Sequence, residues 1–527
     1  MKSFIYWYGI LLILVIFSCT IKPETGSDRP NILLAMADDV SYPHMGAYGT
    51  DWIKTPAFDR VAREGLLFRN CYTPNAKCAP SRSCILTGRN SWQLAEAANH
   101  WPYFPQKFKT YAEVLLENGY YVGYTAKGWG PGRALDAQGN PRELTGKAFN
   151  TAHIDPPARF ISNNDYAENF SIFLDSVPSD TPFCFWYGAI EPHRAYEFRA
   201  GIEKGNKTLE NVGQVPPVWP EVDSIRIDLL DYAFEIEWFD RHLEKMLMEL
   251  EGRGLLDNTL VLVTADNGMP FPRVKAQAYE PSNHLPLAIM WKNGIPDPGR
   301  TVEEYVNFID FAPTFLEIAG LTAEESGMQP IQGKSLMDIF HQDPAGMTGL
   351  DRNYVLVGKE RHDVGRPGDV GYPIRGIVKE GMLYLRNFKP DRWPSGNPET
   401  GYLAADGSPT KSVILHDRRL KGESRYWDWN FGKRPEEELY NITEDPWCIQ
   451  NLAGDPEHQE IREELWNELQ RRLKEQKDPR ILGQGDIFDQ YLYSNESDRG
   501  FYERFMSGEE VEAGWVNPDD FEKEKLD

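Results

Sequence analysis

Two short acidic clusters in this 527-residue chain each follow directly on a run of apolar residues. Asp38-Asp39 follows the run 31–37, and Asp266-Asn267-Gly268 follows the run 260–265. Taken singly, the pair could be a strand-end cap and the triplet a turn. Together they supply only oxygen ligands, the donors that a hard divalent cation prefers. We therefore predict a site for one divalent cation, with Ca²⁺ as the preferred ion.

The surrounding pattern predicts an α/β fold. Short apolar runs bounded by polar residues are typical of strands buried on both faces of a parallel sheet. Ligands of such sheets lie at the carboxyl ends of the strands, where both acidic clusters fall. Apolar residues at helical spacing between Ala233 and Leu250 predict a long helix. A further strand is predicted at 287–291, a helix begins near Asp310, and the alternation continues to about residue 345.

The chain changes character after Asp351. Short strand-like segments at 354–357, 374–378 and 382–385 alternate with loops, and a helix is predicted over 461–473. These patterns predict a small antiparallel sheet with one packed helix. We divide the chain into a signal peptide (1–19), a linker (20–28), a main α/β domain (29–350), a C-terminal subdomain (351–480) and an extension (481–527), which we interpret as a surface wrap or a frayed tail.

The first residues have the pattern of an export signal. Lys2, the apolar run 4–17 and the ending Ser18-Cys19 are similar to a bacterial lipoprotein signal, in which Cys19 becomes lipidated. We predict a periplasmic or cell-surface lipoprotein that meets the membrane only through this anchor; a plain cleaved signal and a short anchor remain alternatives.

The 56 Lys and Arg against 80 Asp and Glu give a net charge of −24. That charge argues against a long basic groove for a polymer, and we predict no nucleic-acid partner.

Cys78-Ala79-Pro80-Ser81-Arg82, closed by Thr87-Gly88-Arg89, resembles the signature of the sulfatase family. In that family a separate maturation enzyme oxidises the cysteine to formylglycine, whose hydrate is the nucleophile. The resemblance implies the fold of the alkaline phosphatase superfamily, a mainly parallel sheet between helices with a smaller C-terminal α+β subdomain. It also implies that one cation is held by the following residues: Asp38, Asp39, Asp266, Asn267 and the modified Cys78.

Four more residues match the family pattern. By resemblance, Arg82 contacts the diol and steadies the metal ligands, and Lys127 and Lys275 bind sulfate. His193 stands where the family has a histidine near the leaving group, and either His193 or Lys275 would protonate the departing amine or alkoxide. Each lysine alone could equally be a solvated surface group, and His193 a structural histidine.

One position departs from the pattern. Many sulfatases have a histidine two residues after the first sulfate lysine, where it assists breakdown of the sulfated diol. This chain has Trp129 there. The base that expels sulfate is therefore open, with His44, His100 and His284 as candidates.

The segment 266–272 is similar to that of the sulfamidase branch, whose members cleave the N–S bond of N-sulfated glucosamine at the non-reducing end. We predict an exo-acting enzyme on a sulfated mono- or oligosaccharide, with sugar contacts from His100, His284, Arg361, His362 and Asp363. A surface loop with a salt bridge is the alternative for Arg361 and Asp363. The rival functions are an O-sulfatase on sulfated galactose, N-acetylgalactosamine or glucosamine, a phosphoester or phosphonate hydrolase, and a non-catalytic lipoprotein that binds sulfated glycans.

Four cysteines remain if Cys19 is lipidated and Cys78 is modified. Their spacing is unlike that of a zinc site. Cys71 and Cys84 flank the signature and could pair in an oxidising compartment, or could be buried free thiols. The sequence leaves both possibilities open.

Overall fold

The computed structural model describes residues 29–342 and 352–526, and its centre is an eight-stranded sheet in the order β10-β2-β9-β8-β1-β7-β4-β6. Strand β9 runs antiparallel to both of its neighbours, and the other pairs are parallel. The sheet is therefore mixed and mainly parallel, as predicted. The strands are β1 (Asn31–Ala37), β2 (Leu66–Tyr72), β4 (Tyr121–Ala126), β6 (Lys147–Ala148), β7 (Phe183–Gly188), β8 (Thr259–Ala265), β9 (His284–Met290) and β10 (Arg300–Asn307).

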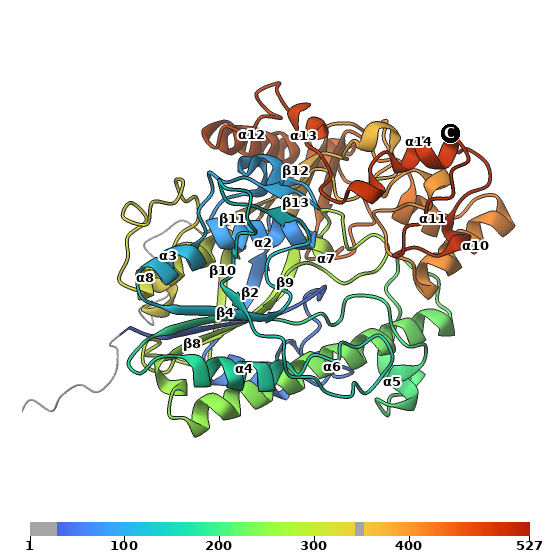
Figure 1. Cartoon of the computed structure of the whole chain (residues 1–527). Helices are drawn as coiled ribbons and strands as arrows, with labels where there is room; N and C mark the ends of the chain where they lie inside the picture. Colours follow the sequence, from blue (N-terminus) through green and yellow to red (C-terminus); the bar gives the residue numbers. More distant parts are fainter. Residues whose placement is uncertain (1–28, 343–351, 527) are drawn as a thin grey trace, which may run out of the picture.

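Helices cover both faces of this sheet. Every residue of β1 and β8 is buried, which explains their unbroken apolar runs. Figure 1 shows one group of helices beneath the sheet and another above it, and each group shares a core with its own face of the strands. The first group includes α1 (Pro56–Glu64), α4 (Tyr166–Ser176) and α6 (Asp223–Gly252), and the second includes α2 (Cys78–Thr87), α3 (Tyr111–Glu117) and α8 (Phe311–Ile318).

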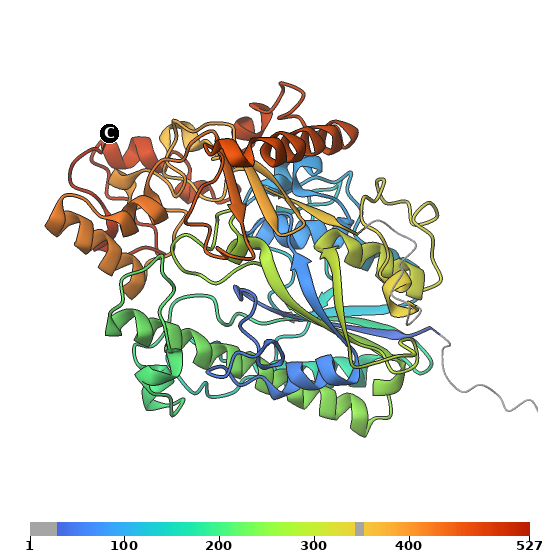
Figure 2. The ribbon, with the colours of Figure 1, turned by 180° about the vertical axis from the view of Figure 1, so that it is seen from behind.

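The C-terminal part forms the predicted antiparallel sheet with one packed helix. Its strands lie in chain order, and α12 (Gln459–Glu475) buries Leu465, Leu469 and Leu473 against them. Seen from behind in Figure 2, this sheet lies on the same side of the main sheet as α2. The strands are β11 (Tyr354–Lys359), β12 (Ile374–Lys379), β13 (Met382–Asn387) and β14 (Glu437–Asn441).

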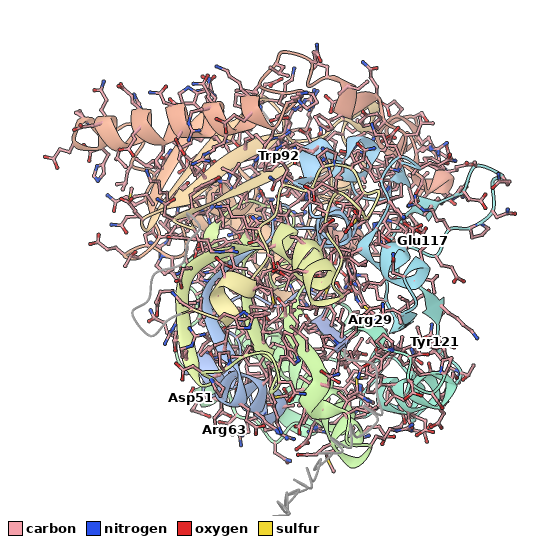
Figure 3. The ribbon with its side chains drawn as sticks, turned by 90° about the vertical axis from the view of Figure 1, so that its left-hand side faces the viewer. Arg29, Asp51, Arg63, Trp92, Glu117 and Tyr121 are labelled. Carbon is pink, nitrogen blue, oxygen red and sulfur yellow. The ribbon has the colours of Figure 1, made fainter. Side chains whose placement is uncertain are left out.

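Trp92 joins the segment after α2 to the C-terminal sheet. It is buried among residues of that sheet, and Figure 3 labels its position. Its indole nitrogen donates to Oε1 of Gln476 over 2.9 Å, and the Arg375 guanidinium lies 5.1 Å from its ring. Arg375 is itself buried and pairs with Asp478 and Glu360, both at 2.8 Å.

We expect Arg375→Ala to lower the free energy of unfolding by about 3–5 kcal/mol, because it leaves the buried Asp478 carboxylate without its cation, while Glu360 keeps Arg480 at 2.7 Å. Arg386 lies directly opposite Arg375 across β12 and β13, but its partner Glu436 is exposed. Arg386→Ala should therefore cost less than about 1 kcal/mol. Denaturant titration of both variants checks this, and equal losses would contradict the assigned role of the buried pair.

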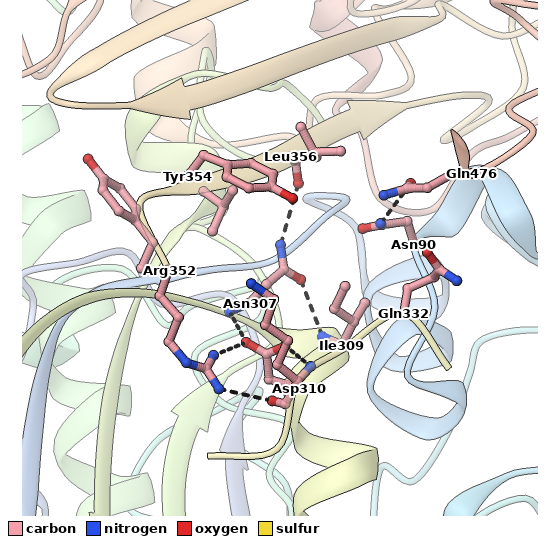
Figure 4. Close-up of a pocket in the computed structure, with 12 residues that line it drawn as sticks. Asn90, Asn307, Ile309, Asp310, Gln332, Arg352, Tyr354, Leu356 and Gln476 are labelled. Atoms are coloured by element: carbon pink, nitrogen blue, oxygen red, sulfur yellow. Dashed lines mark hydrogen bonds and ion pairs between the residues drawn. The ribbon is translucent and has the colours of Figure 1, made fainter. Parts of the chain in front are cut away.

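A small pocket of about 70 Å³ lies where β10 meets the C-terminal sheet (Figure 4). Arg352 spans it, pairing with Asp310 at 3.1 Å and with Asp338 at 3.0 Å. The amide of Asn307 donates to the carbonyl of Leu356 over 3.4 Å. These bonds tie the chain on either side of residues 343–351, and no residue predicted for the site lines this pocket.

The extension wraps around the C-terminal part. Phe501 and Tyr493 are buried beside Leu403, and Lys411 forms a fully buried ion pair with Asp520 at 3.0 Å.

The five cysteines from Cys71 to Cys448 are buried and free, so Cys71 and Cys84 do not form a disulfide. Within the described residues, no helix has the length and apolar character needed to cross a membrane. The predicted signal and Cys19 lie outside those residues.

Candidate active site

The strand register brings the two acidic clusters together. Strands β1 and β8 are parallel neighbours, and Ala37 pairs with Ala265 at their ends. Asp38 and Asp266 are the next residues, so both emerge at the same edge of the sheet. The backbone N–H of Asp39 donates to Oδ1 of Asp266 over 3.1 Å, which locks the two loops together.

These loops form a compact oxygen-rich cluster. Ligand atoms of Asp38, Asp39, Cys78 and Asp266 all lie within 4.8 Å of one another, and all four residues are buried. Asn267 donates its amide N–H to Oδ1 of Asp39 over 2.5 Å, while its own Oδ1 is buried with no hydrogen-bond partner among the described residues. Three carboxylates and an unpartnered amide oxygen are donors that suit Ca²⁺. The residues present therefore fit a hard divalent cation.

Cys78 is the first residue of α2, whose N-terminus meets this cluster. The helix ends where Gly88 adopts a left-handed conformation, with φ of 64°. The Cys78 thiol donates to Oδ1 of Asp38 over 3.5 Å. Burial and the Asp38 carboxylate raise the pKa of this thiol far above its ordinary value. The unpaired N–H groups of a helix N-terminus favour an anion here.

Arg82 braces the cluster from the next turn of α2. Its Nε donates to Oδ2 of Asp266 over 2.8 Å, and its Nη1 donates to the carbonyls of Lys127 and Gly128, each over 2.8 Å. The side chain is fully buried. Arg82 therefore fixes the loop after β4 against a predicted cation ligand.

Two lysines lie against the cluster on different sides. Lys127 pairs with Asp38, and although burial alone would raise the pKa of Asp38, Lys127 holds it below its ordinary value. Lys275 bridges Asp39 at 2.6 Å and Asp406 at 2.9 Å. Both ammonium groups offset the negative charge of the carboxylates. Both also act electrostatically on Cys78, where they would attract an anionic group.

His193 completes the ring of predicted residues. One of its ring nitrogens lies within 4.8 Å of ligand atoms of Asp38 and Cys78. Its Nδ1 lies 2.7 Å from the carbonyl oxygen of Arg194, which can only accept, so Nδ1 carries a proton and donates it there. Nε2 is then the nitrogen available for proton transfer.

A cavity of about 480 Å³ opens over this cluster. Aromatic and polar side chains line it, which is typical of a pocket for a small ligand. The lining includes Asp38, Lys77, Cys78, His100, Trp101, Tyr124, Lys127, Trp129 and His193.

The residues predicted to contact sugar divide into three groups. His100 lines the cavity and Asp363 lies directly behind it. Arg361 and His362 are buried away from its lining, where Arg361 donates to the carbonyl of Tyr491 and His362 bonds Asn75.

His284 lies in another cavity. It is stacked between Tyr42 and Tyr72, with ring centroids 4.0 and 4.6 Å away, and both of its nitrogens are engaged by Glu280 and the carbonyl of Arg69. His44 also lies outside the cavity that Cys78 lines, and it bonds the Tyr232 hydroxyl over 3.1 Å.

Sequence analysis missed two residues of the site. Lys77 precedes the cysteine signature and its ammonium pairs with Asp363 at 2.8 Å. Its position beside Cys78 is the one signal that could have drawn attention to it. Asp406, the partner of Lys275, stands in an Ala-Ala-Asp-Gly segment with the composition of an ordinary turn.

A sequence profile described as Sulfatase matches residues 30–321. The chain belongs to the sulfatase family. The match covers both acidic clusters, the cysteine signature, both lysines and His193, and it makes this chain a hydrolase of sulfate esters or sulfamates.

Two curated relatives extend the similarity over nearly the whole sulfatase. An ulvan-active sulfatase of Formosa agariphila is 26% identical, with 88% of this chain and 78% of that protein covered. The human N-sulphoglucosamine sulphohydrolase is also 26% identical, with 91% and 96% covered. Among solved structures, BT4656 in complex with its substrate D-glucosamine-2-N,6-O-disulfate has a TM-score of 0.57 at 20% identity, covering 85% of this chain and 98% of that one. The sulfatase therefore shares the alkaline-phosphatase-like fold.

Proposed function

We propose that this sulfatase removes sulfate from the non-reducing end of a glycosaminoglycan or related glycan, with the N-sulfate of glucosamine as its substrate. The observation that carries the proposal is the cluster of Asp38, Asp39 and Asp266 around Cys78, whose members Asp38 and Cys78 line one cavity. A relative named N-sulphoglucosamine sulphohydrolase is 26% identical over nearly its whole length, which supports the sugar and the linkage. The cavity volume suits a terminal monosaccharide.

Residue 78 is proposed to act as formylglycine, made from Cys78 by a separate maturation enzyme. Asp38, Asp39, Asp266, Asn267 and the modified residue would hold the divalent cation. When bound, a cation supplies positive charge that offsets the repulsion between an anionic nucleophile and an anionic substrate. The helix N-terminus at residue 78 adds to that effect.

The remaining side chains orient the sulfate and handle the departing group. Lys127 and Lys275 are placed to bind sulfate oxygens, because each lies against a carboxylate next to Cys78. Arg82 keeps the Asp266 carboxylate in place. His193, with Nδ1 bound to a carbonyl, is placed to give a proton from Nε2 to the departing amine.

We expect His193→Ala to lower kcat/KM for a sugar sulfamate by about 10²–10⁴-fold, the usual contribution of a general acid. The loss should be much smaller for 4-nitrophenyl sulfate, since nitrophenolate leaves without a proton. His416, exposed on α10 (Pro409–Lys421), provides a control: His416→Ala should leave both rates unchanged. Equal losses of His193→Ala on both substrates would contradict the acid role.

The substrate is tested by sulfate release from N-sulfoglucosamine by calcium-loaded protein in which mass spectrometry has confirmed the aldehyde at residue 78. Release that is absent from Cys78→Ala would support a sulfamidase. An O-sulfatase is the second candidate, because an ulvan-active sulfatase is equally similar. If the aldehyde-bearing protein releases sulfate from O-sulfated sugars alone, the N-sulfate assignment is wrong.

We also propose that the protein is an exported lipoprotein anchored through Cys19. This proposal rests on the sequence of residues 1–19. Metabolic labelling with a fatty acid tests it: label should enter the wild type and be absent from Cys19→Ala.

A further inference from the structure

His100 stands on the wall of the catalytic cavity in an arrangement that the proposed chemistry has not yet used. It is 6% exposed, and its Nδ1 lies 3.1 Å from Oδ1 of Asp363. The other oxygen of Asp363 receives the Lys77 ammonium at 2.8 Å. Asp363 reaches this position from the C-terminal part, 263 residues further along the chain.

The second ring nitrogen of His100 forms no hydrogen bond within the described residues. This nitrogen, Nε2, is buried. Because an ionised Asp363 only accepts hydrogen bonds, Nδ1 carries the proton and Nε2 presents a lone pair. Burial lowers the pKa of His100 to about 4, so the ring is neutral near pH 7.

The cations and the tryptophan on the described cavity wall offer no lone pair to accept a proton. Lys77 and Lys127 are ammonium groups paired with Asp363 and Asp38, and an ammonium group has no lone pair. Trp129, which stands where many sulfatases have a histidine, donates its indole N–H to Ser83 over 2.8 Å and offers no lone pair. His193 gives its Nε2 proton to the leaving group in the first half of the reaction and then carries a lone pair there, so wild-type turnover of His100→Gln would assign the second proton transfer to His193.

The other histidines that sequence analysis left open lie elsewhere. His44 and His284 line a different cavity, and both nitrogens of His284 already have partners. His100 is the one of the three candidates that lines the cavity with Cys78.

We propose that His100, oriented by Asp363, is the proton acceptor that releases sulfate from residue 78 in the second half of the reaction. After transfer, the carbon of residue 78 carries one hydroxyl and one sulfate ester. Nε2 takes the hydroxyl proton, the O–H electron pair forms the C=O bond, and the C–O bond to sulfate breaks with its electrons leaving on sulfate. The aldehyde is restored, and no oxidant or reductant is needed.

This inference rests on the proposed formylglycine chemistry and not on the identity of the sugar. The experiment therefore uses 4-nitrophenyl sulfate as well as N-sulfoglucosamine, with calcium-loaded, aldehyde-bearing protein. Failure on N-sulfoglucosamine with turnover of the aryl sulfate would refute the proposed substrate and leave the role of His100 to be decided on the aryl ester.

We expect His100→Gln to lower steady-state turnover by about 10²–10⁴-fold. It should nevertheless release one equivalent of nitrophenolate per aldehyde in a rapid first phase, because sulfate transfer does not need His100. The quenched protein should then be heavier by one sulfuryl group on the peptide that contains residue 78. Asp363→Asn should accumulate the same adduct to a smaller extent, because Asp363 positions the His100 ring and does not itself take the proton.

His242 offers a matched control. It is also buried, burial lowers its pKa to about 4, its Nε2 also lacks a partner among the described residues, and Asp165 lies 3.8 Å from its Nδ1. It packs against Tyr166 and Trp238 beneath the sheet, outside the catalytic cavity. His242→Gln should turn over at the wild-type rate and accumulate no adduct.

Two results would overturn the assignment. One is a His100→Gln protein that turns over at the wild-type rate. The other is a variant that loses the first phase together with steady-state turnover while retaining the wild-type unfolding temperature, which would place His100 before sulfate transfer.

Discussion

Cys78→Ala should lose activity by a factor on the order of 10⁴–10⁶ towards every sulfate ester tested, the scale seen when a covalent nucleophile is removed. The expected effect is this large because the change removes both the nucleophile and one member of the cluster formed with Asp38, Asp39 and Asp266. Initial rates of nitrophenolate release, measured at saturating Ca²⁺, provide the test.

Cys84 supplies the matched control for this variant. It lies in the same helix, is as completely buried as Cys78, and belongs to the apolar core above the sheet. Cys84→Ala should keep the wild-type rate per folded molecule, with only a modest loss of stability from the small void. A Cys78→Ala protein that remained active and independent of added metal would refute the proposed mechanism.

Removal of divalent cations should abolish turnover and lower the unfolding temperature, and Ca²⁺ should restore both. Three buried carboxylates and an unpartnered amide oxygen converge at the end of the sheet. A bound cation would therefore reduce the repulsion among these carboxylates in the folded protein. At a free Ca²⁺ concentration about 100 times the Kd, binding should add about 2.7 kcal/mol to the stability of the folded state. Thermal unfolding with a chelator and with Ca²⁺ measures this.

The pair Asp39→Asn and Asp240→Asn separates this effect from a general response to calcium. Asp39→Asn removes one charge from the cluster and should lose most of the calcium-dependent rise in unfolding temperature. Asp240 is equally buried, but it accepts the backbone N–H groups of Ala57 and Phe58 in α1. Asp240→Asn should be less stable and still respond to Ca²⁺. An Asp39→Asn protein with an undiminished response would refute the cation site.

Much of the fold could be read from local patterns. The apolar runs at β1 and β8, the helical spacing within α6, and the short strands β11 to β13 all lie where the sequence predicted them. A strand buried on both faces must be apolar throughout, so its pattern is visible in a window of a few residues. Strands β2, β4, β7 and β10 were not predicted individually, and in β2 the polar residues Arg69 and Asn70 interrupt the apolar pattern.

The roles of individual polar residues were harder to read. Arg361 and His362 are polar, titratable neighbours of Asp363, yet the structure buries them away from the cavity wall. His284 follows the acidic Asp266 cluster in the chain, but as the first residue of β9 it packs between two tyrosines in another cavity. Local sequence gives the type of a side chain and does not give the direction in which a distant loop presents it.

The sequence by itself determined the family and the mainly parallel sheet, and it predicted the residues of the cation and nucleophile cluster. It could do so because these residues stand at strand ends and in one continuous signature, and each is recognisable from its immediate neighbours. Tertiary structure alone decided which groups complete the site. Lys275 meets Asp406 across 131 residues, and His100 meets Asp363 across 263. Such pairs arise only when the C-terminal part folds against the main sheet, because long-range packing leaves no periodic trace in the chain.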